Sequence, residues 1–440
     1  MKQKMSRRYF LGRVSAATLL SSQLAAFPAP GLAQDRSPSS RLNIVNIGIN
    51  GMGGGNLNSV KGENIIALCD INEENLEIKG KEFPDAKRYF DFRTLFDEVK
   101  DIDACVVSTP DHTHAVATIA ALKRGIHCYT EKPLAHEINE IRAMQKLAAE
   151  KKLHTQMGTV IHATDNYRRV VELIQAKAIG EVTEVHVWCQ KGWGGFAMPT
   201  TTVPCPDTIH WDQWIGPAPM IPYDPCYQPA RWRGYWPFGT GTFGDMACHL
   251  MDLPFWALNL GYPKSVEATC PTDMDPMLCP LDVTARYEFE LTDPDGKTRT
   301  LPLTWYDGVC RPEVIAEKGL ENLGMGIIFV GTDGLLEADY GTIRLYPEAK
   351  FADYKRPEPS IAPSLGHHAE WLESIRQDKP LSLCEFQYAG RLSEAVQLGA
   401  VSLRAGKKKL LYDAANMKIT NCPEANALLA RDYRDGWSLD

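Results

Sequence analysis

The sequence lacks several features that would place it in a common class of protein. Its twelve cysteines include no C-x-x-C pair, which argues against a redox dithiol and a structural zinc site. Beyond the first 33 residues, no apolar run reaches the roughly 18–20 residues that a membrane-spanning helix needs. No basic block offsets the net charge of −8, so the surface repels nucleic acid and anionic membranes. There is no internal repeat, and 440 residues suffice for two domains or so.

The first 33 residues predict an export signal. An arginine pair at positions 7 and 8 precedes a modestly apolar run, and small residues at 31–33 offer a cleavage site before Gln34. This order is typical of a twin-arginine signal peptide, so we expect the protein to be exported, with a periplasmic location. Removal of residues 1–33 deletes only basic charges and makes the mature chain more acidic still.

The pattern of strands and helices divides the rest of the chain in two. Over residues 42–150, buried-strand patterns alternate with helical ones, which predicts a doubly wound parallel sheet. From about residue 157, strands follow one another without intervening helices, which predicts an open, mostly antiparallel sheet. The tail from residue 367 returns to helix. We therefore expect an α/β protein with a signal peptide at 1–33, a nucleotide-binding domain at 40–155, and a substrate and oligomerisation domain at 156–440 whose last helices return toward the first domain.

A glycine-rich turn follows the first expected strand and predicts a dinucleotide site. It reads Gly48-x-Asn50-x-x-Gly53, a variant of the G-x-G-x-x-G pattern that lets backbone approach a pyrophosphate at a helix N-terminus. Asn50 replaces the second glycine, and we expect it to take a left-handed conformation. Asp70 ends the next strand, about 20 residues on, where an acid binds ribose hydroxyls and disfavours a 2′-phosphate. The expected cofactor is therefore NAD rather than NADP, held in this region by Gly48, Asn50, Gly51, Met52, Gly53 and Asp70.

A lysine and an acid–histidine pair are the candidate catalytic groups. Lys132 follows a strand at the carboxyl edge of the predicted parallel sheet, where such sheets bind ligands. Asp245 and His249 lie four residues apart, on one face of an expected helix. A histidine can take a hydroxyl proton, and we expect the carboxylate to orient the ring. The alternative is that none of the three is catalytic. Lys132 would then be a solvated lysine in a loop, Asp245 an acid at the start of a helix, and His249 a buried histidine whose hydrogen bonds are satisfied.

Aromatic residues gather where a substrate would bind. Six of the ten tryptophans lie between positions 188 and 236, together with three tyrosines and two arginines. Aromatic faces stack on the C–H faces of sugar rings, so the composition suits a carbohydrate; the alternative is that these rings attach a long loop to the core. The candidate substrate residues are Trp193, Arg231, Trp232 and, less directly, Tyr306.

The spacing of histidines and the remaining cysteines predicts no metal site. The histidines at 112, 162, 210, 367 and 368 show no ligand pattern. Two cysteine pairs could form disulfides in an oxidising compartment, namely Cys205 with Cys226 and Cys270 with Cys279. We instead expect Cys69, Cys105 and Cys128 to be small buried hydrophobic residues.

Taken together, these motifs resemble the glucose–fructose oxidoreductase / inositol dehydrogenase / MocA (Gfo/Idh/MocA) family. The resemblance extends over nearly all of the chain after the signal, including Trp211-x-x-Trp214-x-Gly216-Pro217 and Asn421-Cys422-Pro423. It implies a Rossmann domain and an α/β domain whose open sheet often mediates dimers or tetramers. It also implies hydride transfer between a sugar or polyol carbon and nicotinamide, with Lys132, Asp245 and His249 as the catalytic set and His249 as the general base.

The resemblance also implies which loops hold the cofactor. The loop from Thr109 to His114 would lie against it, although Asp111 or His114 could instead cap the following helix. The implied cofactor residues at these strand ends are Ser108, Thr109, Pro110, His114, Glu131 and Lys132.

Export and NAD binding together constrain the expected reaction. Soluble NAD is not exchanged outside the cytoplasm, so we expect an oxidoreductase with tightly bound nicotinamide that a second carbonyl compound reoxidises. One alternative is a redox-neutral glycosidase that acts through a transient 3-keto sugar. Another is a non-catalytic module that senses a sugar or NAD.

Overall fold

The computed structural model describes residues 40–292, 295–320 and 323–439. The predicted twin-arginine signal lies outside these residues. Within them, no helix combines the length and the apolar character that crossing a membrane requires.

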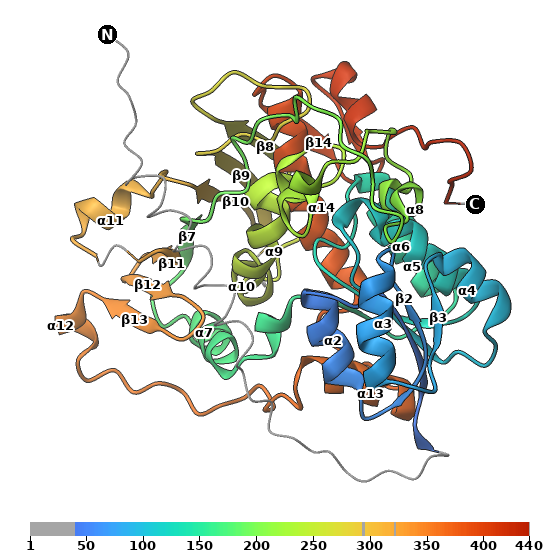
Figure 1. Cartoon of the computed structure of the whole chain (residues 1–440). Helices are drawn as coiled ribbons and strands as arrows, with labels where there is room; N and C mark the ends of the chain where they lie inside the picture. The colour runs from blue at the N-terminus through green and yellow to red at the C-terminus, as the bar shows by residue number, and fades with distance from the viewer. Residues whose placement is uncertain (1–39, 293–294, 321–322, 440) are drawn as a thin grey trace, which may run out of the picture. The chain divides into compact units, whose positions relative to one another are not determined.

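The N-terminal half contains a six-stranded sheet in the order β3-β2-β1-β4-β5-β6, and every neighbouring pair is parallel (Figure 1). The strands are β1 (Asn43–Ile47), β2 (Asn64–Cys69), β3 (Lys87–Tyr89), β4 (Ala104–Val107), β5 (His127–Thr130) and β6 (Thr155–Met157). The central strands β1 and β4 are buried almost throughout, as their apolar runs predict. The predicted doubly wound parallel sheet is confirmed.

Helices cover both faces of this sheet. On one face, side chains of α2 (Met52–Val60), α3 (Glu73–Glu82) and α13 (His367–Gln377) pack in a common core cluster with β1, β2 and β4. On the other face, α4 (Phe92–Glu98), α5 (His114–Lys123) and α6 (Ile138–Glu150) belong to the main core. Since helix α13 comes from the C-terminal part of the chain, the chain returns to the N-terminal sheet before it adds the last two strands, at 410–413 and 418–419, to the second sheet.

The second half contains a nine-stranded sheet in the order β13-β12-β11-β7-β10-β9-β8-β14-β15. Its strands are β7 (Val182–Cys189), β8 (Ser265–Thr269), β9 (Thr284–Thr292), β10 (Thr298–Asp307), β11 (Met325–Gly331), β12 (Leu335–Ala338), β13 (Ile343–Tyr346), β14 (Leu410–Asp413) and β15 (Lys418–Ile419). Strands β7 and β10 pair in parallel, and the other pairs are antiparallel. The expected open, mostly antiparallel sheet is confirmed.

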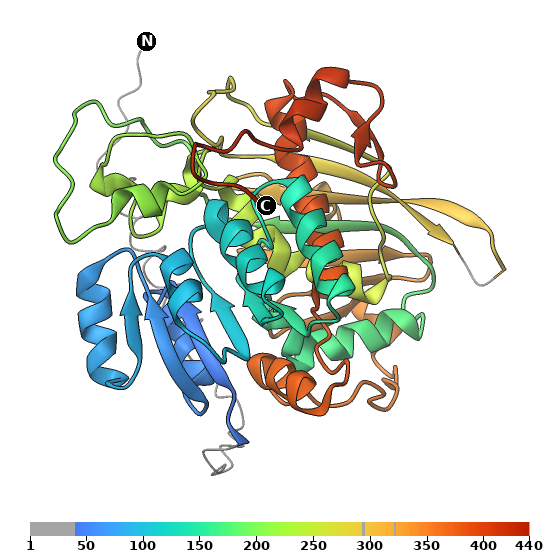
Figure 2. The same ribbon diagram turned by 90° about the vertical axis from the view of Figure 1, so that its right-hand side faces the viewer.

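The long helix α14 (Phe386–Arg404) joins the two halves. It packs against α6 of the first half and against β8 of the second, and Figure 2 shows it in red beside the teal helices. The remaining helices are α7 (Asp165–Gln175), α8 (Trp211–Ile215), α9 (Cys248–Leu250), α10 (Asp252–Ala257), α11 (Glu313–Glu317) and α12 (Glu348–Phe351), with short 3-10 turns between them. Strand β6 pairs with β5 and ends at Met157, so the boundary expected at residue 155 cuts through the last strand of the parallel sheet.

The cysteines are all free thiols. The pairs expected between Cys205 and Cys226 and between Cys270 and Cys279 are therefore not formed. The Cys226 thiol instead lies 3.6 Å from the Tyr235 hydroxyl, and the Cys279 thiol donates to the Arg233 carbonyl at 3.6 Å. Cys69, Cys105 and Cys128 are buried, as expected for small hydrophobic residues.

Candidate active site

The glycine-rich turn between β1 and α2 has room only for backbone. A Cβ on Gly53 would lie 2.1 Å from the Gly48 carbonyl oxygen, and one on Gly48 would lie 2.6 Å from the Ser108 carbonyl oxygen. Gly48 and Gly51 have positive φ values of 79° and 54°. Gly51 precedes α2 and no side chain caps that helix, so its first N–H groups are free to bind an anion. These features fit the pyrophosphate of a dinucleotide.

The backbone conformation of Asn50 differs from the predicted one. Asn50 is not among the residues with positive φ, and the left-handed position belongs to Gly51 instead. Its side chain accepts a hydrogen bond from the Gly51 N–H at 2.8 Å and donates to the Asn75 side chain at 3.1 Å. The turn therefore forms without a glycine at position 50 because the next residue supplies the left-handed conformation. Neighbouring Met52 is about half exposed at the first position of α2.

Asp70 lies at the carboxyl end of β2, where the sequence predicts a ribose-binding acid. Its carboxylate accepts hydrogen bonds from the Ile49 and Asn72 N–H groups and from the Asn75 side chain at 3.0–3.1 Å. Burial raises the pKa of Asp70 against the lowering effect of these donors. Donors from the glycine-rich turn, from the segment after β2 and from α3 therefore hold the Asp70 carboxylate in place.

The loops after β4 and β5 are joined at the same edge of the sheet. Asn56 of α2 donates to the Ser108 hydroxyl and to the Glu131 carboxylate, both at 2.9 Å. The His114 ring contacts the carbonyls of Thr109 and Pro133, both at 2.8 Å. Burial lowers the pKa of His114 to about 4, so the ring is neutral at physiological pH. Pro110 precedes the 3-10 turn η2 (Asp111–Thr113), which leads into α5. The cofactor residues predicted at the strand ends thus come together in one group of loops.

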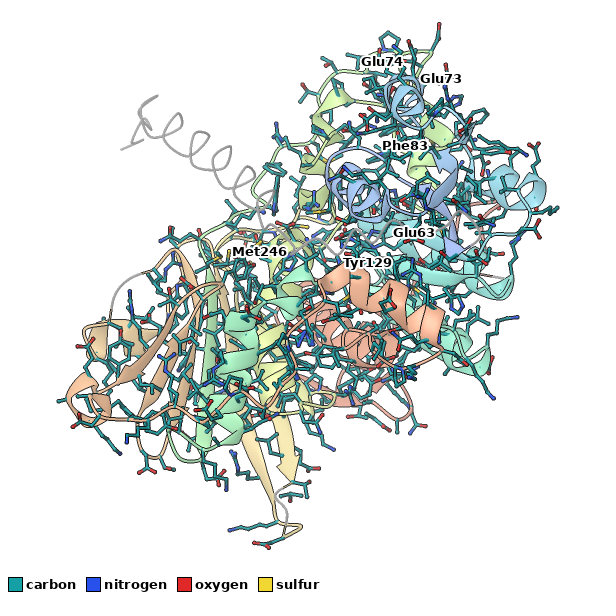
Figure 3. All side chains as sticks on the ribbon, turned by 90° about the horizontal axis from the view of Figure 1, so that it is seen from below. Glu63, Glu73, Glu74, Phe83, Tyr129 and Met246 are labelled. Atoms are coloured by element: carbon teal, nitrogen blue, oxygen red, sulfur yellow. The ribbon has the colours of Figure 1, made fainter. Side chains whose placement is uncertain are left out.

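Lys132 and Asp245 form a buried ion pair between the two halves of the molecule. The Lys132 ammonium donates to the Asp245 carboxylate at 3.0 Å and to the Asp245 carbonyl at 2.8 Å, and both side chains are only 6% exposed. Asp245 belongs to η6 (Phe243–Ala247), a π-helical turn, which is a local widening often found at functional sites. In Figure 3 the neighbouring Met246, and Tyr129 of β5, are labelled in the central region of the molecule.

Two further cations and an indole reach the same carboxylate. The Lys191 ammonium lies 2.6 Å from Asp245 Oδ2, and Arg233 Nε lies 3.1 Å from Oδ1. Trp193 donates its indole N–H to Oδ2 at 2.6 Å. Burial alone would raise the pKa of Asp245, but the charges of Lys132, Lys191 and Arg233 outweigh it and hold the pKa well below 3.8. Asp245 is therefore ionised at every physiological pH.

His249 is buried in α9, one turn beyond Asp245. Burial, and then the charge of Lys132, lower the pKa of His249 well below 6.5, so the ring is neutral and can accept a proton. Among the described contacts, none joins the Asp245 carboxylate to the His249 ring. The expected orienting contact is not among them, because three cations and an indole contact both carboxylate oxygens. The charge of Asp245 still acts on His249 and opposes the lowering of its pKa. The Nδ1 atom of His249 is buried without a described hydrogen-bond partner.

Asp111 adds a second buried acid to this group. A Cβ on Gly244 would lie 3.0 Å from an Asp111 carboxylate oxygen, so Asp111 packs directly against the π-helical turn. Burial raises the pKa of Asp111 to about 7, although Arg233 and Lys132 oppose the shift. The sequence placed Asp111 in the expected cofactor loop or at a helix cap, and the tertiary structure places it with the ionisable groups.

The predicted substrate residues separate into different environments. Trp193 contacts Asp245, as described. Trp232 is buried in a separate aromatic cluster, donates to the Pro229 carbonyl at 3.1 Å, and lies under the Arg233 guanidinium at 4.3 Å. Arg231 is exposed, with its guanidinium 4.5 Å from the Phe196 ring centroid. Its position in sequence next to Trp232 therefore does not bring it to Asp245.

Tyr306 is not part of this group. Its neighbour Trp305 stacks near Phe243 of η6, within the main core. Side chains alternate along a strand, so Tyr306 points to the opposite face of the nine-stranded sheet, where its hydroxyl lies 3.2 Å from His186 Nδ1. The prediction that Tyr306 contacts substrate is not supported by this placement.

Lys191 and Arg233 also contact Asp245, and neither is among the site residues expected from the sequence. Arg233 lies in the aromatic segment, next to Trp232. Lys191 lies two residues beyond the end of β7, and a cation just beyond a strand end is the signal that could have indicated it. Their side chains are 36% and 21% exposed, so they border the buried ion pair on its solvent side.

Family models match both halves of the chain. Residues 42–159 match the oxidoreductase family with an NAD-binding Rossmann fold, and residues 177–439 match the C-terminal alpha/beta domain of that oxidoreductase family. The chain belongs to the Gfo/Idh/MocA oxidoreductase family. The expected resemblance is thereby confirmed, and the glycine-rich turn is part of an NAD-binding domain.

Curated members of the Gfo/Idh/MocA family match part of the chain. A levoglucosan dehydrogenase of Pseudarthrobacter phenanthrenivorans is 26% identical over 194 residues, which are 42% of this chain and 40% of that protein. A glycosyl hydrolase family 109 protein of Solibacter usitatus is 30% identical over 198 residues, 41% of this chain and 44% of that protein. The matches thus span about two fifths of the length of these relatives.

A solved structure extends the likeness in fold. The WlbA dehydrogenase from Bordetella pertussis, in complex with NADH and UDP-GlcNAcA, superposes with a TM-score of 0.60 at 17% identity. The superposition covers 85% of this chain and 99% of that one. At this identity the similarity shows a common fold.

Proposed function

We propose that this protein is an NAD-dependent oxidoreductase that transfers hydride between a hydroxyl-bearing carbon of a sugar or polyol and tightly bound nicotinamide. The observation that carries the proposal is the buried Lys132–Asp245 ion pair beside the neutral His249, next to the cofactor loops. The sugar dehydrogenases among the relatives support the substrate class.

In this proposal each residue of the site has a separate role. His249 accepts the hydroxyl proton of the substrate, since its imidazole is neutral and buried. Lys132 has three N–H donors, of which two contact Asp245, and the third can hold the oxygen that loses its proton. Asp245 holds the ammonium in position. When bound, NAD supplies the hydride acceptor, and its pyrophosphate would be held by the turn at Gly48–Gly53 with Asp70 at the ribose. A carboxylate at position 70 favours NAD over NADP.

A redox-neutral glycosidase is the second candidate. The glycosyl hydrolase family 109 protein, 30% identical over 198 residues, favours it. Such a reaction would oxidise the sugar transiently, eliminate the aglycone with a proton, add water to the resulting double bond and return the hydride to the keto carbon. It would use the same base and the same lysine, so the two candidates differ in products rather than in site residues.

Absorbance spectroscopy of the purified protein tests both candidates. The spectrum would be recorded before and after adding a panel of free sugars, polyols and glycosides, and the products would be checked for glycosidic cleavage. A reduced-nicotinamide band that persists until a carbonyl compound is added is the expected result. Cleaved glycoside without a lasting band would identify the glycosidase. Purification without any bound nucleotide would contradict the tightly bound cofactor.

Export and assembly complete the proposal. The arginine pair at positions 7 and 8 supports export by the twin-arginine route to the periplasm, with a mature chain that begins at Gln34. N-terminal sequencing of the secreted protein tests the cleavage site, and replacing both arginines with lysine should retain the protein in the cytoplasm. The family resemblance supports a homo-oligomer, a dimer or a tetramer, which light scattering would measure.

A further inference from the structure

Three potential metal ligands from distant parts of the chain meet in the interior of the molecule. His162 belongs to η3 (Val160–Ala163), Asp252 is the first residue of α10, and Cys384 precedes α14. One ligand atom of each lies within 4.8 Å of the other two, and all three side chains are fully or almost fully buried. They are separated by 90 residues or more in sequence, which is why spacing along the chain predicted no metal site.

The histidine and the aspartate are held rigidly. His162 Nδ1 lies 3.0 and 2.9 Å from the two carboxylate oxygens of Asp252. The Tyr388 hydroxyl donates to Asp252 Oδ1 at 2.7 Å. The His162 ring also stacks on Trp256, with 4.0 Å between ring centroids. The ring and the carboxylate are therefore oriented before any ligand arrives.

These contacts leave a polar atom unsatisfied. His162 Nε2 is buried and has no hydrogen-bond partner in the described part of the chain. A buried polar atom without a partner is costly, and a buried carboxylate needs a nearby positive charge. A cation bound between these groups would place a positive charge beside the Asp252 carboxylate.

We propose that His162, Asp252 and Cys384 bind a zinc ion. An imidazole, one carboxylate and a thiolate form a donor set that Zn²⁺ accepts, whereas Ca²⁺ and Mg²⁺ prefer oxygen ligands alone. One Zn²⁺ with a carboxylate, a thiolate and a neutral imidazole is electrically neutral, which suits a fully buried site. Tetrahedral zinc needs ligand atoms roughly 3.3–3.8 Å apart, so side-chain shifts of about 1 Å suffice. The fourth position would be filled by Tyr388 or a water.

The ion would have a structural role. It would join the segment before α14 to η3 and α10, which the His162–Asp252 hydrogen bonds already connect to each other. Asp252 lies three residues after His249, so fixing Asp252 also fixes the end of the segment that carries the proposed base. The proposal does not depend on which sugar reaction the enzyme performs.

Elemental analysis of the untagged full-length protein tests the proposal. The protein would be expressed with added zinc, dialysed against metal-free buffer, and measured for manganese, iron, cobalt, nickel, copper and zinc. We expect about one zinc per chain, and loss of most of it in Cys384→Ser and in His162→Gln. The matched control is Cys105→Ser, which changes an equally buried thiol in β4 and should keep the metal.

Cobalt spectroscopy gives a second readout that does not require stable ligand-free variants. Wild-type protein and Cys105→Ser, grown with cobalt, should both show thiolate-to-cobalt charge-transfer absorption, and Cys384→Ser should lack it. The proposal is overturned if wild-type protein carries less than a tenth of a metal ion per chain, since a water would then satisfy the cluster. It is equally overturned if Cys384→Ser keeps the full metal content, since the ion would then be bound elsewhere.

Discussion

Replacing Asp245 with asparagine keeps the shape of the side chain and removes the charge on which three cations converge. In the wild-type protein the carboxylate lies 3.0 Å from Lys132, 2.6 Å from Lys191 and 3.1 Å from Arg233. Lys191 and Arg233 are partly exposed and can turn toward water. Lys132 is 6% exposed and cannot, so its uncompensated charge should dominate the cost.

Breaking a buried ion pair by removing one partner costs about 3–5 kcal/mol. We therefore expect Asp245→Asn to lower the free energy of unfolding by about that amount at pH 7, measured by urea denaturation. The matched control is Asp97→Asn, which removes the partner of Arg124 at the same 3.0 Å, but between side chains that are 71% and 42% exposed. An exposed pair of this kind should cost less than about 1 kcal/mol.

The pH dependence gives the decisive check. The pKa of Asp245 in the folded protein lies well below 3.8, so its stabilising contribution is complete above the unfolded-state value and is lost only as the pH falls below about 4. The difference between wild type and Asp245→Asn should thus be the same at pH 7 and pH 5. A difference that already shrinks between these values, or a cost no larger than that of Asp97→Asn, would refute the reasoning.

The other predictions concern the reaction, the cofactor turn and the second acid. Lys132→Met and His249→Asn should keep bound nucleotide while turnover falls by at least about 100-fold, the ordinary contribution of a general base; retention of full activity would contradict the assigned roles. Because burial holds the pKa of His249 well below 6.5, protonation of His249 should cause no loss of kcat/KM near pH 6.5. If kcat/KM changes near pH 7 and the change disappears in Asp111→Asn, the change belongs to Asp111. Gly53→Ala should lose bound nucleotide and stability because its Cβ would lie 2.1 Å from the Gly48 carbonyl, whereas Gly55→Ala in the same helix, with nothing within 4 Å, should be neutral or slightly stabilising. Asp111 has its pKa raised to about 7 in the folded state, so its contribution is lost as the pH rises from about 4 to 7, and Asp111→Asn should become more stable relative to wild type over that range in urea titrations.

The sequence alone determined the local features of this protein. Alternating apolar runs and helical patterns predicted the parallel sheet, because strand and helix periods are properties of neighbouring residues. The turn at Gly48 and Gly53 was also visible, since the clash of a Gly53 Cβ with the Gly48 carbonyl is local, although the Ser108 carbonyl that excludes a Cβ from Gly48 comes from the end of β4. Even there, the left-handed residue was assigned to Asn50 rather than Gly51, because either residue tolerates that conformation.

Only the tertiary structure decided which charges share one buried space. Lys132, Lys191, Arg233 and Asp245 lie on four separate segments, and their distances follow from how the two sheets and α14 pack. The i, i+4 spacing of Asp245 and His249 indicated a pair, but a carboxylate binds the strongest donors within reach, and those came from elsewhere in the chain. Strand alternation likewise placed Tyr306 on the far face of its sheet, and packing brought His162, Asp252 and Cys384 together. Spacing along a chain carries little information about such contacts, because most of them join segments that are far apart in sequence.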